Sequence, residues 1–70
     1  MDMIPVQSSN IESIGYESST ETLHVRFTDG STYEYKGVPS FIYDGLMSAS
    51  SHGSFLNREI KNQYPYEKIG

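Results

Sequence analysis

The chain of 70 residues contains no cysteine and no tryptophan. Without cysteine, neither a disulfide framework nor a thiolate metal site can help to hold the fold, and a reducing compartment is favoured. No apolar run approaches the roughly 20 residues that span a membrane, and the N-terminus, with Asp2 and no basic residues, does not resemble a secretion signal. We therefore expect one soluble, unexported domain in the cytoplasm.

Basic residues are also scarce, because five Lys and Arg stand against nine Asp and Glu, for a formal net charge of -4. Tight non-specific binding of nucleic acid needs many cations at the phosphates, so this balance disfavours it. The cations are unevenly placed, since three of the five lie within residues 52–70: Arg58, Lys61 and Lys68. An anionic partner would meet the protein there.

Aromatic residues are what the chain has in quantity, with six tyrosines and three phenylalanines. A chain this short is near the lower limit at which a hydrophobic core alone can stabilise a fold. Each buried aromatic ring removes a large area from water. The tyrosines are therefore expected to build much of the core.

Three strands are predicted after a flexible arm at residues 1–9, within a single domain at residues 10–70. In the first strand Ile11 and Ile14 are three positions apart, which predicts a bulge beside Gly15. The second strand, residues 22–28, alternates cleanly between apolar and polar residues. The third covers residues 31–38.

The turn between the second and third strands decides which way Tyr33 and Tyr35 point. A two-residue loop ending at Gly30 would place both rings on the solvent face, as a platform with His24 and Arg26. A three-residue loop, with Gly30 left-handed, would place both rings in the core. We favour the second register, because the first buries a carboxylate and leaves two aromatic rings exposed.

Two helices are predicted after Pro39, which ends the sheet and suits the first turn of a helix. The first helix should run from Pro39 to Ala49, and its Gly45 should allow another backbone to approach closely. Gly53 could provide a left-handed kink before a second helix from Ser54 to Gln63. The predicted fold is α+β: a three-stranded antiparallel β-meander followed by two helices packed on one face, in the order β-β-β-α-α.

The order of these elements and their residues resembles the KTSC domain, a module at the C-terminus of some lysyl-tRNA synthetases and also found as small bacterial and phage proteins. The resemblance covers most of the chain and implies no catalytic residue; the synthetase context suggests RNA binding. The residues that carry it are Ile11, Ile14, Gly15, Tyr16, Leu23, His24, Val25, Arg26, Phe27, Gly30, Tyr33, Glu34, Tyr35, Val38, Pro39, Ala49, Ser50, Ser51, His52, Gly53, Phe55, Leu56, Asn57, Ile60 and Tyr64.

Catalysis and metal binding are both disfavoured by the sequence. Ser50, Ser51, His52 and Asp44 are the residue types of a hydrolytic triad, but their setting between two helices is more typical of helix caps. His24 and His52 lack the spacing of a readable metal site. We expect no enzyme, no cofactor and no metal.

The predicted function is a protein–protein interaction module, with an unknown protein partner or self-association. The alternative is a weak binder of single-stranded RNA, in which aromatic rings stack bases and cations contact phosphates. In the favoured register the candidate nucleic-acid-binding residues are Arg58, Lys61, Tyr64, Tyr66 and Lys68. A structural role is expected for the motif residues Tyr33, Tyr35, Gly30, Pro39, Gly53 and Asn57.

Overall fold

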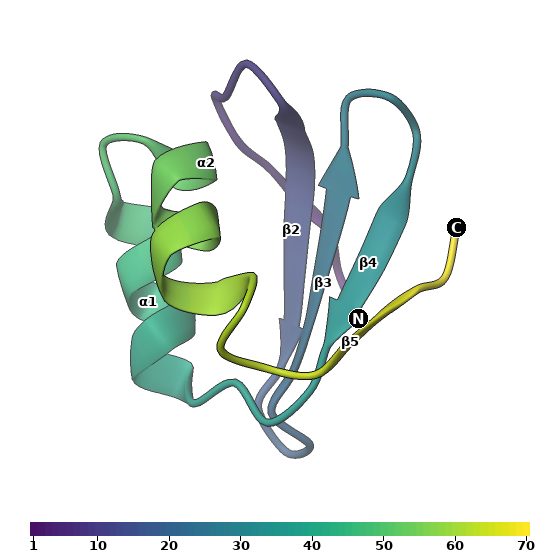
Figure 1. Ribbon diagram of the computed structural model, residues 1–70, viewed down its shortest axis with the longest axis vertical. Coiled ribbons are helices and arrows are strands. Elements are labelled where there is room, and N and C mark those ends of the chain that lie inside the picture. The colour runs from purple at the N-terminus through teal and green to yellow at the C-terminus, as the bar shows by residue number, and fades with distance from the viewer.

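The computed structural model describes residues 1–70 as a five-stranded antiparallel sheet with helices packed on one face (Figure 1). The strands lie side by side in chain order, and the helices are inserted between the fourth and the fifth. No helix has the length and apolar character needed to cross a membrane. The elements are β1 (Ile4–Pro5), β2 (Ile11–Glu17), β3 (Thr22–Phe27), β4 (Thr32–Tyr35), α1 (Ser40–Ser48), α2 (His52–Phe55), the π-helical turn η1 (Leu56–Ile60) and β5 (Tyr66–Lys68).

The predicted three-stranded meander is the centre of this sheet, and the prediction was wrong in the number of strands. β1 pairs with β2, with Ile4 opposite Ile14, inside the segment predicted as a flexible arm. β5 pairs with β4, with Glu67 opposite Glu34. Both added strands are short and exposed, so neither carries the alternation of apolar and polar residues by which a strand is recognised.

A bulge interrupts the β2–β3 pairing, but it lies between Ile11 and Ser13 rather than beside Gly15. Gly15 is regularly paired with His24 and serves a different purpose. A Cβ atom there would come within 2.6 Å of Met3 Sδ, because the N-terminal residues pass over this point. Glycine at this position gives the chain before β2 room to lie on the sheet.

The β3–β4 hairpin has the register that the sequence favoured. Phe27 N–H donates to the carbonyl of Ser31 at 2.8 Å, which closes a three-residue loop, and Gly30 is left-handed with φ of 93°. Tyr33 therefore lies opposite Val25, and Tyr35 opposite Leu23. Both rings are on the face that the helices cover, and the solvent-facing platform of the other register is excluded.

The first helix was predicted within one residue at each end, whereas the second begins earlier than expected. Ser51 accepts a hydrogen bond from Ser54 N–H and caps α2, so the helix includes Gly53. The expected left-handed kink at Gly53 was wrong, because the positive-φ glycines are Gly30 and Gly37. Gly45 faces the Phe55 ring, where an added Cβ would be 2.8 Å from Cζ, rather than another backbone as predicted.

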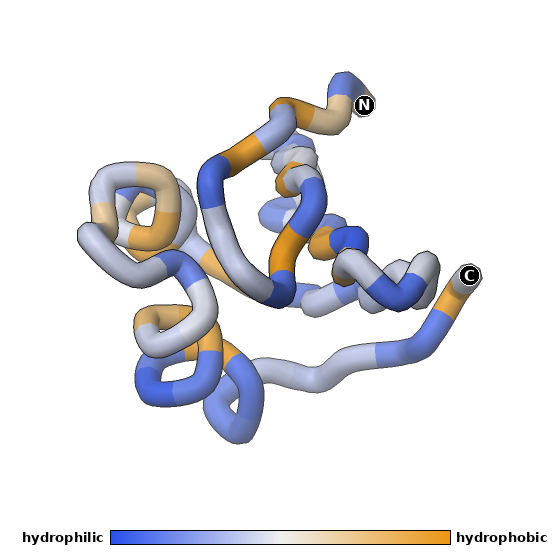
Figure 2. The backbone as a smooth tube through the Cα atoms, turned by 90° about the horizontal axis from the view of Figure 1, so that it is seen from above, coloured by the Kyte–Doolittle hydropathy of each residue, from blue (hydrophilic) through white to orange (hydrophobic).

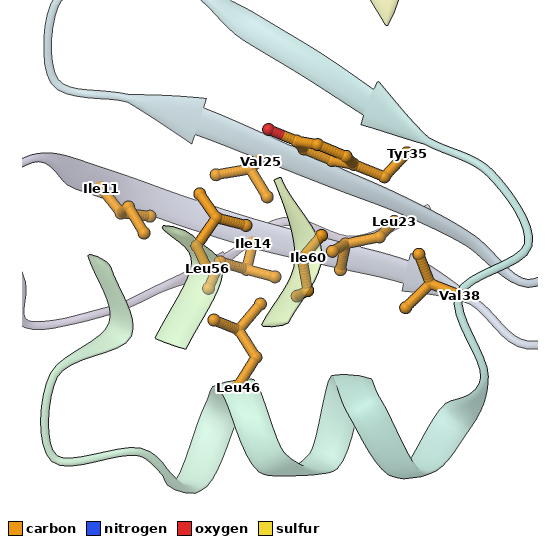
Figure 3. Close-up of a cluster of buried hydrophobic side chains, with 9 residues drawn as sticks. All are labelled: Ile11, Ile14, Leu23, Val25, Tyr35, Val38, Leu46, Leu56 and Ile60. Carbon is orange, nitrogen blue, oxygen red and sulfur yellow. The ribbon is translucent and has the colours of Figure 1, made fainter. Parts of the chain in front are cut away.

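The core lies between the sheet and the helices, where side chains from both layers meet (Figure 3). In the view from above in Figure 2, the helices lie at the left and both ends of the chain at the right. Burying an aliphatic side chain of this size contributes about 1.5–3 kcal/mol, so a few such residues dominate the stability. The buried cluster comprises Ile11, Ile14, Leu23, Val25, Tyr35, Val38, Leu46, Leu56 and Ile60.

Candidate binding groove

An open groove of about 470 Å³ lies between the end of the β3–β4 hairpin and the π-helical turn η1. It is on the helix side of the sheet, where the helices do not reach as far as the hairpin loop (Figure 1). Its lining is divided between apolar and polar groups, as in sites that bind a ligand and orient it. The lining residues are Asn10, Phe27, Thr28, Asp29, Ser31, Tyr33, Tyr35, Leu56, Asn57, Lys61 and Tyr66.

Aromatic rings from three strands form one wall of the groove. Tyr33 packs edge-on against Phe27, with ring centroids 5.7 Å apart. Tyr66 lies on its other side, 5.9 Å from Tyr33 and 5.8 Å from Tyr35. Tyr35 is only 3% exposed, whereas Tyr66 is 59% exposed. The cluster therefore runs from the core out to solvent.

The opposite wall is the π-helical turn, which begins at Leu56. Lys61 N–H donates to the Leu56 carbonyl at 2.8 Å, five residues back rather than four. Such wide turns are uncommon and occur frequently at functional sites. This turn presents two polar side chains to the groove, the Asn57 amide and the Lys61 ammonium.

The hairpin loop contributes a carboxylate whose position is set locally. Asp29 Oδ1 accepts hydrogen bonds from the Ser31 hydroxyl at 2.6 Å and from the Ser31 backbone N–H at 2.9 Å. These bonds, the hydroxyl foremost, lower the pKa of Asp29 below its usual value. Lys68 on β5 also stabilises the charged form. The Asp29 carboxylate is therefore held at the end of the groove in its ionised state.

Asn10 joins the groove to the start of α2. Its backbone carbonyl accepts from Thr28 N–H at 3.0 Å, which ties the residue before β2 to the hairpin loop. Its side chain lies against Gly53, where an added Cβ would be 2.7 Å from Oδ1. The structural role expected of Gly53 is thus to let the helix approach Asn10.

The predicted nucleic-acid-binding residues are not gathered at one place. Lys61 and Tyr66 line the groove, and Lys68 lies opposite Tyr33 on β5. Arg58 is paired with Glu59 at 3.0 Å and covers the Phe55 ring, outside the groove. Tyr64 is half-buried against the core.

Two of the residues weighed for catalysis, Ser51 and His52, shape the connection between α1 and α2. Ser51 caps α2 through Ser54, and His52 Nδ1 is 2.8 Å from the Leu46 carbonyl at the end of α1. His24 lies on the far face of the sheet, where its Nε2 is 2.9 Å from Glu34 Oε2. The two histidines therefore lie in different parts of the molecule.

Glu34 on that far face predicts a measurable dependence of stability on pH. Its pKa is lowered from the usual value of 4.5, chiefly by the hydrogen bond from His24 and then by Lys36, whose Nζ is 3.3 Å away. A carboxylate with a depressed folded-state pKa stabilises the fold above its unfolded pKa, and that contribution is lost as the pH falls through the folded value. Unfolding in urea should show this loss below about pH 4.5 in the native protein.

Glu34→Gln should flatten that part of the pH profile. Glu12, an exposed carboxylate on β2 without an ion pair, provides the matched control. A Glu12→Gln variant should keep the native slope. Equal slopes for the native protein and Glu34→Gln would contradict the assigned role of the pair.

The groove could not be found from the sequence because its parts are distant in the chain. Asn10, Asp29 and Asn57 were assigned to a strand start, a turn and a helix. Only the fold brings them together, and the wide turn that aims Asn57 and Lys61 has no sequence signature. Asn57 belonged to the motif set, where a structural role was expected for it, and the structure places it exposed in the wall of the groove.

The comparisons with known proteins agree with one another. The sequence matches the KTSC domain over residues 7–64. A protein from Tsukamurella paurometabola is 44% identical over 62 residues, which cover 89% of this chain and 92% of the relative. The crystal structure of a KTSC domain protein from Yersinia pestis has a TM-score of 0.95 and 40% identity, covering 99% of this chain and 97% of that one.

A lysine–tRNA ligase from Trichormus variabilis is also similar, at 36% identity over 67 residues. The alignment covers 96% of this chain but only 12% of the ligase. This chain therefore corresponds to a small part of that enzyme.

Proposed function

The chain belongs to the KTSC domain family, and we propose that it is a non-enzymatic module that binds a partner protein through the aromatic groove. The observation that carries this proposal is the position of Tyr66, a large ring that is 59% exposed beside an open groove. Tyrosine is enriched at the centres of protein interfaces, where it supplies a large contact area at small entropic cost. A partner that covered Tyr66 would extend the ring cluster that begins in the core.

The charges around the groove favour a protein over a nucleic acid. Lys61 is the one cation among the lining residues, and Asp29 provides an anion in the same groove. An anionic backbone would bring repeated phosphates close to that carboxylate, which the Ser31 bonds hold ionised. A polypeptide can carry a single charge opposite Lys61 or Asp29 and remain neutral elsewhere.

Single-stranded RNA is the second candidate, and one observation favours it. Tyr66 and Lys61 lie on the same groove, which is the pairing of an aromatic ring and a cation used to stack bases and contact phosphates. A relative that contains a similar domain is a lysine–tRNA ligase, an enzyme whose name refers to an RNA substrate. The formal net charge of -4 weighs against RNA.

The proposal is tested by selecting random peptides displayed on phage against the immobilised domain. Peptides that bind through the groove should bind the Tyr66→Ser variant about tenfold more weakly than the native domain. This is the loss expected when an exposed interface ring is removed. Phe41→Ser is the matched control, because Phe41 is an aromatic residue that is 70% exposed and lies outside the groove. Circular dichroism should show both variants folded.

A labelled uridine tract, followed by fluorescence anisotropy, separates the two candidates. The RNA candidate would be supported, and the protein partner contradicted, by two results together. The tract would bind with an affinity that falls with salt and is lost in Tyr66→Ser, and no peptide would depend on the groove. Peptides that bind Tyr66→Ser and the native domain equally would show that the groove is not the binding surface.

A further inference from the structure

β5 is an edge strand whose outer side carries backbone groups available for pairing. The bonds to β4 come from alternate residues: Lys36 N–H donates to Pro65 O at 2.9 Å, and Ile69 N–H to Thr32 O at 2.8 Å. In an antiparallel ladder the intervening residues direct their N–H and C=O groups the other way. Tyr66 and Lys68 therefore present their backbone groups to the open edge, since no strand lies beyond β5.

The same two residues direct their side chains toward the groove side of the sheet. Tyr66 is opposite Tyr35 and Lys68 is opposite Tyr33, and cross-strand partners share a face. A strand added beside β5 would place every second side chain on that face, next to Tyr66 and Lys68. The edge and the groove would then be covered by one extended segment.

The lysines on this face favour an acidic residue in a strand bound beside β5. Lys61 and Lys68 form no ion pair, whereas Lys36 and Arg58 are each bonded to a glutamate. One acidic side chain of a bound strand would be complementary to Lys68, and one apolar side chain would pack on Tyr66. Because β5 offers these two residues two positions apart, the segment needs the same spacing.

We propose that β5 and the groove bind an extended peptide of a partner protein, which adds to the sheet as a sixth strand and carries an apolar residue two positions from a single carboxylate. The apolar side chain covers Tyr66 and enters the groove, and the carboxylate lies by Lys68. The backbone of the peptide pairs with Tyr66 and Lys68. This inference rests on the proposed function and specifies its partner.

The test uses synthetic peptides with alternating threonines and one phenylalanine two positions from a glutamate, titrated into the isotopically labelled protein and followed by NMR. Shifts should centre on Tyr66, Lys68 and Lys61. Methylating the two peptide nitrogens that pair with β5 should weaken binding about tenfold, since two backbone hydrogen bonds are removed. Replacing the glutamate by lysine should weaken it about fivefold.

Lys68→Glu should reverse the preference between the glutamate and lysine peptides. Glu67→Lys is the matched control, because Glu67 is on the same strand and its side chain is on the opposite face, with Glu34. That variant should change the affinity for either peptide by less than about twofold.

Two results would overturn this inference and leave the proposed function standing. One is a set of phage-selected peptides that need Tyr66 but bind equally well after backbone methylation. The other is a set of such peptides that lacks acidic residues and is indifferent to Lys68→Glu. Absence of any peptide that depends on Tyr66 would overturn both proposals together.

Discussion

Tyr35→Ala should lower the free energy of unfolding by about 3–5 kcal/mol, the range for removing a buried aromatic side chain. Tyr35 is 3% exposed, and its ring packs between the sheet and the helices (Figure 3). Burial also raises the pKa of its hydroxyl, with Tyr33 and Tyr66 adding to the effect. A domain of 70 residues has a total stability of about 4–10 kcal/mol, so this variant should lose a large share of it.

Tyr33→Ala provides the comparison, because Tyr33 lies on the same strand and the same face but is only half-buried. Its loss should reduce stability by about 1–2 kcal/mol, in proportion to the smaller area removed from water. Urea unfolding followed by circular dichroism measures both variants, and Tyr35→Phe controls for the hydroxyl. Equal losses for Tyr33→Ala and Tyr35→Ala would contradict the difference in burial between the two rings.

Leu46→Ala should destabilise the protein by about 3–4 kcal/mol, because it leaves a cavity under α1 that the neighbouring side chains cannot fill. Leu46 is the one fully buried residue of that helix. Its side chain points from α1 toward Ile14 and Leu56 of the buried cluster, as Figure 3 shows. The amides of α1 should exchange with solvent more rapidly than those of β3 in this variant.

Phe41→Ala tests the same helix from its exposed side. Phe41 is larger than Leu46 but 70% exposed, so its removal should change the free energy of unfolding by less than about 0.5 kcal/mol. Urea unfolding of the two variants under one set of conditions compares them directly. A loss at Phe41 as large as that at Leu46 would mean that Phe41 is covered by another surface in solution.

The central part of the fold could be predicted because its residues alternate strongly. Leu23, Val25 and Phe27 alternate with polar residues, and the cost of burying Glu34 selected the correct turn at Gly30. The limits of the first helix followed from Pro39 and the spacing of its apolar residues. These features depend on neighbours in the sequence, and the structure confirms them.

The outer strands could not be predicted, since both are short and all of their residues are exposed, so they show no alternation of apolar and polar residues. β5 joins β4 only after the helices have turned the chain back, and all three of its residues are exposed. The groove depends on that return, because Tyr66 forms one of its sides. Sequence reasoning identified Lys61 and Tyr66 as candidates, but it grouped them with Arg58, which the fold places elsewhere.

The position of β5 at the end of the chain affects how fast it pairs with β4 and how easily that pairing opens. The pairings among β1 to β4 join segments that are adjacent in the chain, whereas the β4–β5 pairing closes a loop of about 30 residues that contains all the helices. Strands paired over short distances form early, and a short, exposed strand paired over a long one opens at the smallest cost in free energy. Amide hydrogen exchange should therefore be faster at Glu67 than at Val25. A partner bound at this edge would slow that opening and so order the last strand of the domain as it binds.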